Sequence, residues 1–156
     1  MSIFNSRNLP KMSITKMGSL PALAVVGAMA FASTPSYALD KEAYQLSSHI
    51  LDISTGKPAP NVDVQLMKQQ SNGSWELLDT KATSSEGRVN EFLPNDGKTK
   101  HDGTYKLIFK TAPYFRKQGI DPFFPYVEVN FNIEGDKHYH VPITLSPYGY
   151  STYRGS

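Results

Sequence analysis

The chain has 156 residues, a formal net charge of +2 and no cysteine. Without cysteine it has no disulfides, no thiol nucleophile and no thiolate zinc ligand, so packing, often together with assembly, must stabilise the fold. The 16 basic and 14 acidic residues nearly balance, and no cluster of Lys and Arg is dense enough to indicate a nucleic-acid partner.

The first 38 residues have the composition of an export signal. Residues 1–17 carry three basic side chains and no acid, and residues 18–32 are small and apolar. Ser-Tyr-Ala then offers small residues at both specificity positions of a signal peptidase. We predict a signal peptide over 1–38, cleaved after Ala38 or alternatively after Ala32, and a periplasmic protein without membrane contact. A retained anchor is the competing interpretation, but about fifteen apolar residues fall short of the roughly 20 that span a bilayer.

Residues 39–156 are predicted to form one domain, and they alternate between apolar and polar side chains as β-strands do. In the first half, strands are expected over Gln45–Leu51, Val62–Leu66, Trp75–Lys81, Arg88–Leu93 and Gly103–Lys110. The dipeptide Asn-Gly between the second and third of these strands is a strong hairpin signal.

The second half contains the one expected helix. Tyr114–Gln118 followed by Gly119 predicts a short helix with a glycine stop. Strands are expected over Val127–Ile133 and His138–Leu145, and the tail from Tyr148 can add a last one. Seven or eight short strands with one short helix predict an all-β fold, a two-sheet β-sandwich.

The expected strand His138–Leu145 separates its side chains by face. The core face takes Tyr139, Val141, Ile143 and Leu145. The other face takes His138, His140, Pro142 and Thr144. Two imidazoles therefore lie on a surface that is not the core of the domain. The tail beyond them is aromatic, whereas chain ends are usually frayed and polar, so we expect both to pack against a partner surface.

Residue types alone leave the histidines open to three interpretations. His49, His138 and His140 can be structural groups, acid–base catalysts, or the His-x-His pair and third histidine of an open zinc site. His101 lies in a polar loop and is expected to be a solvated surface residue. Arg88 follows a Glu-Gly turn and, without further context, would form a surface ion pair.

Six stretches, however, match one family in detail. They are Ser48–Asp52 (SHILD), Gly56–Ala59 (GKPA), Glu86–Arg88 (EGR), Phe123–Pro125 (FFP), His138–Pro142 (HYHVP) and Ser146–Ser156 (SPYGYSTYRGS). Together they resemble the 5-hydroxyisourate hydrolases, the purine-catabolic branch of the transthyretin-like proteins. The closing Tyr-Arg-Gly-Ser discriminates most, since hormone-carrying transthyretins resemble the fold but lack this ending and the His/Arg set.

The resemblance implies a transthyretin-like β-sandwich that assembles as a homotetramer, with sites in a channel where dimers meet. The catalytic residues that it implies are His49, Arg88 and His140. The substrate-binding residues that it implies lie in the tail and are Tyr153, Arg154 and Ser156. His138 is left as a neighbour without a role. The implied reaction is the hydrolysis of 5-hydroxyisourate, the urate oxidation product, to 2-oxo-4-hydroxy-4-carboxy-5-ureidoimidazoline without a metal or other cofactor.

These side chains are suited to that chemistry. A neutral imidazole serves as general base near neutral pH, and Arg88 keeps its charge and presents a planar fork of donors to an oxyanion. Two other classes remain: a transthyretin-like protein that binds a small ligand without turning it over, and a periplasmic metal-binding module built on the histidines. Turnover of freshly generated 5-hydroxyisourate distinguishes the first, and loss of activity on chelation would favour the second.

Overall fold

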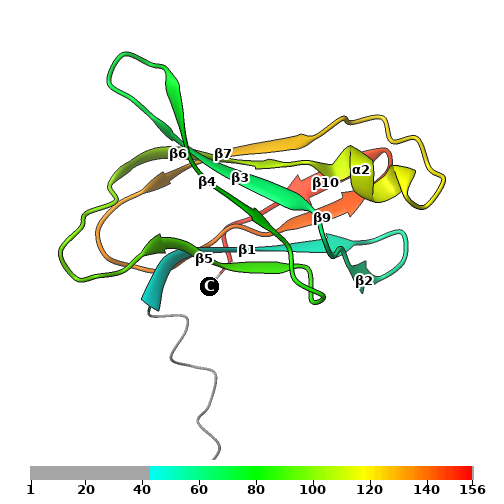
Figure 1. Ribbon diagram of the computed structural model, residues 1–156, viewed down its shortest axis with the longest axis horizontal. Helices are drawn as coiled ribbons and strands as arrows, with labels where there is room; N and C mark the ends of the chain where they lie inside the picture. Colours follow the sequence, from blue (N-terminus) through cyan, green and yellow to red (C-terminus); the bar gives the residue numbers. More distant parts are fainter. Residues whose placement is uncertain (1–42, 156) are drawn as a thin grey trace, which may run out of the picture. The chain divides into compact units, whose positions relative to one another are not determined.

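The computed structural model describes residues 43–155, which form two β-sheets packed face to face (Figure 1). The predicted all-β sandwich with one short helix is confirmed. The predicted signal peptide over 1–38 and the last predicted site residue, Ser156, lie outside the described residues. Between residues 43 and 155, no helix is long and apolar enough to cross a membrane.

The first sheet is built around β1 (Tyr44–Asp52). Its antiparallel neighbours are β2 (Lys57–Pro58) and β5 (Arg88–Pro94). Its parallel neighbours are β8 (Tyr139–His140) and β9 (Ile143–Ser146), and β10 (Gly149–Thr152) extends the sheet beyond β9. β1 is therefore the strand on which segments from the middle and the end of the chain meet.

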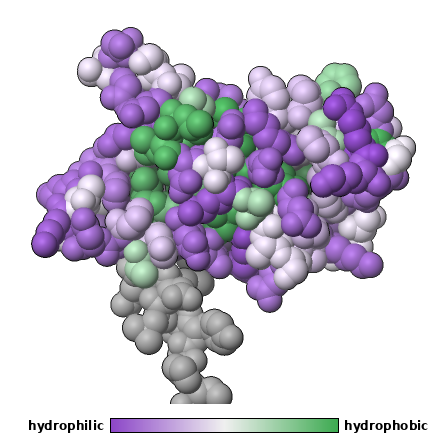
Figure 2. Space-filling model, viewed as in Figure 1, coloured by the Kyte–Doolittle hydropathy of each residue, from purple (hydrophilic) through white to green (hydrophobic). Residues whose placement is uncertain are grey.

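The second sheet is antiparallel throughout and has the order β4 (Trp75–Ala82), β3 (Asp63–Gln69), β6 (Gly103–Phe109), β7 (Val127–Ile133). The core fills the space between the two sheets. Its largest fully buried side chains include Leu46, Ile50, Phe92, Leu66, Tyr105, Leu107, Phe109 and Ile143. Each large apolar side chain buried in this way stabilises the fold by roughly 1.5–3 kcal/mol. Figure 2 shows one face of the molecule, on which apolar residues are exposed among polar ones. The exposed apolar side chains of the described residues include Leu77 and Leu78 of β4.

The helix α2 (Thr111–Arg116) lies at one end of the sandwich (Figure 1). It begins three residues before the predicted Tyr114 and ends two residues before the predicted Gln118. Gly119 beyond it adopts the positive φ (+77°) expected of a glycine stop. The buried carboxylate of Asp52, the last residue of β1, accepts hydrogen bonds from the Tyr114 hydroxyl (3.0 Å) and the Ser54 amide (2.8 Å). This contact ties the helix to the end of the central strand.

The predicted strand His138–Leu145 is wrong as one continuous element. The structure divides it into β8 and β9, with Val141 and Pro142 between them. Proline has no amide hydrogen for the ladder, which explains the interruption. Val141, Ile143 and Leu145 are buried as predicted, and Pro142, which was predicted on the outer face, is buried as well.

A β-bulge in β5 sets the side-chain directions next to the site. Leu46 pairs with Phe92 and Ser48 with Val89, so two steps along β1 match three along β5. The extra residue lets Val89 and Phe92 both point into the core although they are three positions apart, an offset that would put them on opposite faces of a regular strand. Arg88, which precedes Val89, consequently points to the outer face.

Candidate active site

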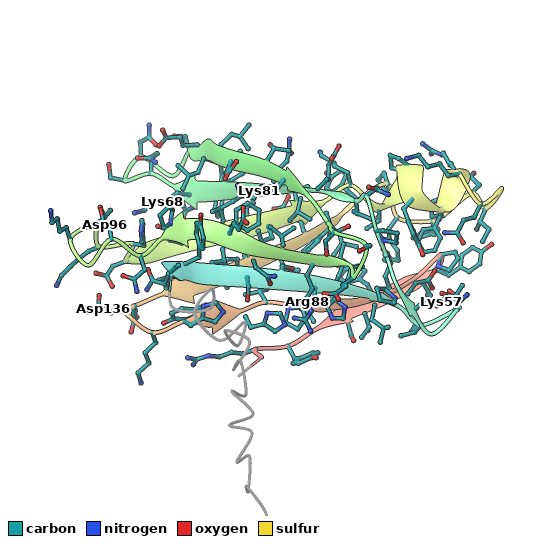
Figure 3. The ribbon with its side chains drawn as sticks, turned by 60° about the horizontal axis from the view of Figure 1, so that its bottom comes forward. Lys57, Lys68, Lys81, Arg88, Asp96 and Asp136 are labelled. Carbon is teal, nitrogen blue, oxygen red and sulfur yellow. The ribbon has the colours of Figure 1, made fainter. Side chains whose placement is uncertain are left out.

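The predicted site residues of β1 and β5 face away from the core. Leu46, Ser48 and Ile50 of β1 are 0–1% exposed and point into the sandwich, so Ser47 and His49 point outward. His49 pairs directly with Arg88 across the antiparallel ladder. Neighbouring strands lie about 4.8 Å apart, so the imidazole and the guanidinium project side by side from one sheet face. Figure 3 shows Arg88 next to β1 on the side of the molecule that comes forward in that view.

The turn before β5 places Arg88 opposite His49. Within it, the Gly87 amide donates to the Ser84 carbonyl (2.9 Å), and the Ser84 amide donates to the Arg88 carbonyl (2.9 Å). Gly87 has a φ of +68°, and a Cβ there would lie 2.6 Å from the carbonyl oxygen of Ile50. Only glycine fits both the conformation and the space. The Glu-Gly-Arg motif therefore forms the turn that positions Arg88 opposite His49.

The environment of His49 favours its neutral form. Burial lowers the pKa of His49 below its usual 6.5, and the positive charge of Arg88 lowers it further, while a hydrogen bond with the Glu86 backbone acts in the opposite direction. At neutral pH this imidazole is uncharged and has a lone pair to offer. Arg88, beside it, retains its positive charge.

The second catalytic candidate, His140, reaches the same face from the other side of β1. In the parallel ladder Ser47 pairs with His140, and the Ser47 hydroxyl lies 2.9 Å from His140 Nδ1. The same hydroxyl lies 2.9 Å from His138 Nε2, and His138 Nδ1 lies 2.9 Å from the Tyr44 carbonyl oxygen. Residues two positions apart on one strand lie about 7 Å from each other. This distance separates His49 from Ser47 and its partner His140.

Sequence reasoning did not select Ser47 as a site residue. Ser47 lies two positions before His49 on one strand, so the side-chain alternation puts both on the same face. This shared face was the sequence signal that could have identified Ser47. What the sequence could not show is that β8 lies parallel to β1 and carries both histidines to that hydroxyl.

The C-terminal tail closes on His140. The Gly155 amide donates to the His140 carbonyl (2.8 Å), and a Cβ at 155 would lie 2.5 Å from His140 Cδ2. The Arg154 guanidinium instead lies 5.1 Å from the centre of the Tyr139 ring, on the side of β8 away from the imidazoles. Tyr153 and Arg154, with Phe131 and Tyr139, line a groove of about 460 Å³. Within one chain the structure thus brings Gly155 to the histidine face but not Arg154, and the substrate-binding role of the tail stays a prediction.

His101 lies apart from this group. Its Nε2 is 3.1 Å from the Pro94 carbonyl oxygen, in the loop that joins β5 to β6, where it is partly buried. Although three histidines share the outer face of the first sheet, no three His, Asp or Glu side chains within residues 43–155 are grouped so as to hold a metal ion. The arrangement offers imidazole lone pairs and one guanidinium instead.

The fold and the site together define a class: a two-sheet β-sandwich with a histidine–arginine pair and a second histidine on the outer face of one sheet, and a C-terminal tail against that second histidine. Residues 46–155 match the HIUase/Transthyretin family. The chain belongs to this family, and the resemblance that the sequence motifs indicated is confirmed.

Named relatives match over most of their length. A 5-hydroxyisourate hydrolase of Salmonella typhi is 47% identical over 125 residues, which cover 80% of this chain and 90% of that protein. A probable 5-hydroxyisourate hydrolase of Caenorhabditis elegans is 47% identical over 112 residues, which cover 71% of this chain and 81% of that protein.

Solved structures support the same fold. The 5-hydroxyisourate hydrolase of Klebsiella pneumoniae superposes with a TM-score of 0.62 at 37% identity, covering 72% of this chain and 99% of that one. A transthyretin from Sparus aurata superposes with a TM-score of 0.66 at 30% identity, covering 71% and 96%. The fold is therefore shared by both branches, and the side chains of the site must decide between them.

Proposed function

We propose that this protein hydrolyses 5-hydroxyisourate to 2-oxo-4-hydroxy-4-carboxy-5-ureidoimidazoline. The observation that carries the proposal is the direct pairing of His49 with Arg88 on an outer sheet face that also bears His140. The names of the relatives supply the substrate. The substrate is a small planar ring with imide-like carbonyls, and a guanidinium fork suits such oxygens.

The reaction joins a water oxygen to a ring carbonyl carbon and breaks the ring C–N bond. In our proposal, His140 takes one proton from the attacking water and returns it to the leaving nitrogen. Arg88 stabilises the negative charge that develops on the carbonyl oxygen, an effect typically worth about 3–4 kcal/mol for one well-placed donor. His49 stays neutral beside Arg88 and orients the water with its lone pair. No step needs a metal ion.

The deciding experiment is the turnover of freshly generated 5-hydroxyisourate. A urate-oxidising enzyme supplies the intermediate, and its ultraviolet absorbance decays faster in the presence of the protein. The expected result is a catalysed decay that persists after treatment with a chelator. Binding of the intermediate without faster decay would favour a transthyretin-like carrier, and a loss of rate on chelation that zinc reverses would favour a metal site.

The tail residues Tyr153, Arg154 and Ser156 are proposed to bind substrate in an assembled homotetramer. Tyr153 is largely exposed in the single chain, and His49, His140 and Arg88 lie on an open sheet face, so a neighbouring subunit is needed to enclose the ring. Sedimentation velocity tests the assembly. A fully active monomer would contradict it.

Export to the periplasm is proposed from the basic and apolar residues of 1–38. Cell fractionation followed by mass spectrometry is expected to find a soluble product that begins near Leu39. A membrane-bound product that retains Met1 would contradict this part of the proposal.

A further inference from the structure

A chain of three hydrogen bonds ends at His140, and the two other side chains in it, those of Ser47 and His138, have no role in the reaction proposed above. It runs from the Tyr44 carbonyl to His138, from His138 to Ser47, and from Ser47 to His140, with a separation of 2.9 Å at each step. We propose that Ser47 and His138 are positioning residues that hold the ring proton of His140 on Nδ1, so that Nε2 carries the lone pair. This inference rests on the proposed function, because it concerns the base in that reaction.

The direction of the chain follows from its first member. A carbonyl oxygen only accepts hydrogen bonds, so His138 Nδ1 must carry a proton and donate it to Tyr44. In neutral His138, Nε2 is then an acceptor, and the Ser47 hydroxyl must donate to it. A hydroxyl has one hydrogen, so Ser47 Oγ can only accept from His140 Nδ1. The neutral His140 ring is thereby fixed in its Nδ1–H tautomer.

The fold keeps this direction from relaxing. Ser47 is only 4% exposed although it faces outward, because the two imidazoles that it contacts cover it. Water therefore has little access to the hydroxyl as an alternative partner. The parallel pairing of Ser47 with His140 and of Leu46 with Tyr139 fixes the spacing of the donor and acceptor atoms. Each donor and acceptor atom in these three hydrogen bonds thus has a defined partner, which is the condition for a rigid polar network.

The consequence for catalysis is that His49 and His140 have different roles. A positive charge on His49 would form next to Arg88, its partner across the ladder, and is disfavoured there. When His140 Nε2 takes up a proton, by contrast, the hydrogen bonds to Ser47 and His138 can redistribute the positive charge. As His140 Nδ1 yields its proton to Ser47, the hydroxyl passes its own to His138 Nε2. The charge is then shared between two imidazoles, and no atom is lost or gained.

The test is a nitrogen-15 NMR spectrum of the histidine rings in the full chain, recorded at a pH high enough for the rings to be neutral. His140 is expected as the Nδ1–H tautomer. Ser47→Ala removes the acceptor and His138→Ala frees the Ser47 proton for His140 Nδ1, so each variant is expected to populate the Nε2–H form. An unaltered protein with His140 already in the Nε2–H form would overturn the proposal, as would a Ser47→Ala variant in which the tautomer is unchanged.

Ser48→Ala is the matched control. Ser48 is buried one position further along β1 and donates to the Val141 carbonyl (2.8 Å), but it contacts neither imidazole. It is expected to lower stability without moving the tautomer. Thermal unfolding of all variants shows that they are folded, and the spectrum requires no substrate.

Kinetics then connect the tautomer to the reaction. Ser47→Ala is expected to lower kcat on the order of 10- to 100-fold with little change in KM, the range seen when an orienting partner is removed. The double variant Ser47→Ala/His138→Ala should be no slower than Ser47→Ala alone, since both act through one chain. Additive losses, or a folded Ser47→Ala with normal kcat, would overturn the positioning role. Absence of turnover by the unaltered protein would contradict the proposed function, whereas the tautomer is decided by the spectrum alone.

Discussion

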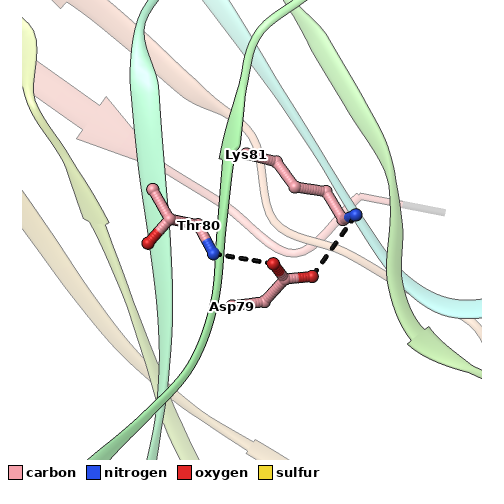
Figure 4. A network of polar contacts seen from close by, with 3 residues as sticks. All are labelled: Asp79, Thr80 and Lys81. Carbon is pink, nitrogen blue, oxygen red and sulfur yellow. Dashed lines mark hydrogen bonds and ion pairs between the residues drawn. The ribbon is translucent and has the colours of Figure 1, made fainter.

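β1 and β4 both carry polar side-chain clusters, but the two clusters differ in burial and in how far apart in the sequence their members lie. On β1, Ser47 is covered by two imidazoles that lie 91 and 93 residues further along the chain. On β4, Lys81 pairs with Asp79 on the same strand at 3.3 Å, and Asp79 also accepts from the amide of Thr80 (Figure 4). The pair on β4 remains 31% and 42% exposed. The first cluster joins two strands with fixed geometry, whereas the second joins a strand to itself and stays hydrated.

This difference shows which polar contacts constrain the structure around them. An exposed ion pair between flexible side chains contributes about 0–1 kcal/mol and tolerates rearrangement. A buried network whose donors and acceptors are all assigned has one arrangement, and disturbing a member affects the others. We therefore expect large, coupled effects on the β1 face and small, independent ones on β4.

The largest expected effect comes from the proposed catalytic residues on the β1 face. His49→Ala, Arg88→Ala and His140→Ala should each lower turnover roughly 10²–10⁴-fold. Pairs of these substitutions should lower it by much less than the product of the single effects, because the residues act as a unit. The measurement is kcat/KM on 5-hydroxyisourate, with thermal unfolding to confirm folding.

His101→Ala is the internal control for this set, because His101 lies in a separate loop. It should be nearly silent in turnover. Folded His49→Ala and His140→Ala variants with normal rates would remove the distinction between the β1 and β4 clusters.

A smaller effect is expected from the turn that presents Arg88. Gly87→Ala would place a Cβ 2.6 Å from the Ile50 carbonyl oxygen at a φ of +68°, so it should lower the free energy of unfolding by roughly 1–3 kcal/mol. Urea denaturation measures this loss. Gly73→Ala, with φ +82° but no atom within 4 Å of its Cβ, is the control for the conformational strain alone. Equal losses at both positions would show that the close approach to β1 does not matter.

The next effect sharpens the electrostatics of the β1 face. The pKa of His49 lies below 6.5 because of burial first and Arg88 second, so Arg88→Gln should raise the pKa of His49 part of the way toward 6.5. A histidine NMR titration measures both values. Since the unfolded chain binds this proton more readily than the folded one, the stabilisation is fully present above pH 6.5 and is lost as the pH falls toward the folded pKa.

Turnover should fall in the same acid range, because protonated imidazoles no longer offer a lone pair. An unchanged pKa of His49 in Arg88→Gln would mean that the guanidinium does not act on the imidazole. An undiminished rate well into the acid range would count against a histidine base.

The smallest effect is expected on β4. Asp79→Ala removes the partner of Lys81 and should change the free energy of unfolding by less than about 1 kcal/mol, with no change in turnover. Urea denaturation at low and high salt measures it, and salt should reduce even this difference. A loss of several kcal/mol, or any loss of activity, would contradict the contrast between the β1 and β4 clusters.

The sequence by itself determined most of the strands and their faces. Alternation along Gly103–Lys110 separates Tyr105, Leu107 and Phe109 from Lys106 and Lys110, and the structure buries all three apolar side chains. It likewise separated Leu46, Ser48 and Ile50 from Ser47 and His49, because the side-chain period of a strand is a local property of the backbone. The motifs selected the family and, through it, His49, Arg88 and His140.

Only the tertiary structure decided which faces meet. The parallel pairing of β1 with β8 brings His138 and His140 to Ser47, and the antiparallel pairing of β1 with β5 brings Arg88 to His49. The bulge in β5 adjusts one ladder without a clear local signal, whereas Pro142 is itself the local signal for the break between β8 and β9. Strand order and register depend on packing between segments some 40 to 90 residues apart, as the partners Ser47–His140 and His49–Arg88 show, and local periodicity carries no information about such distant partners.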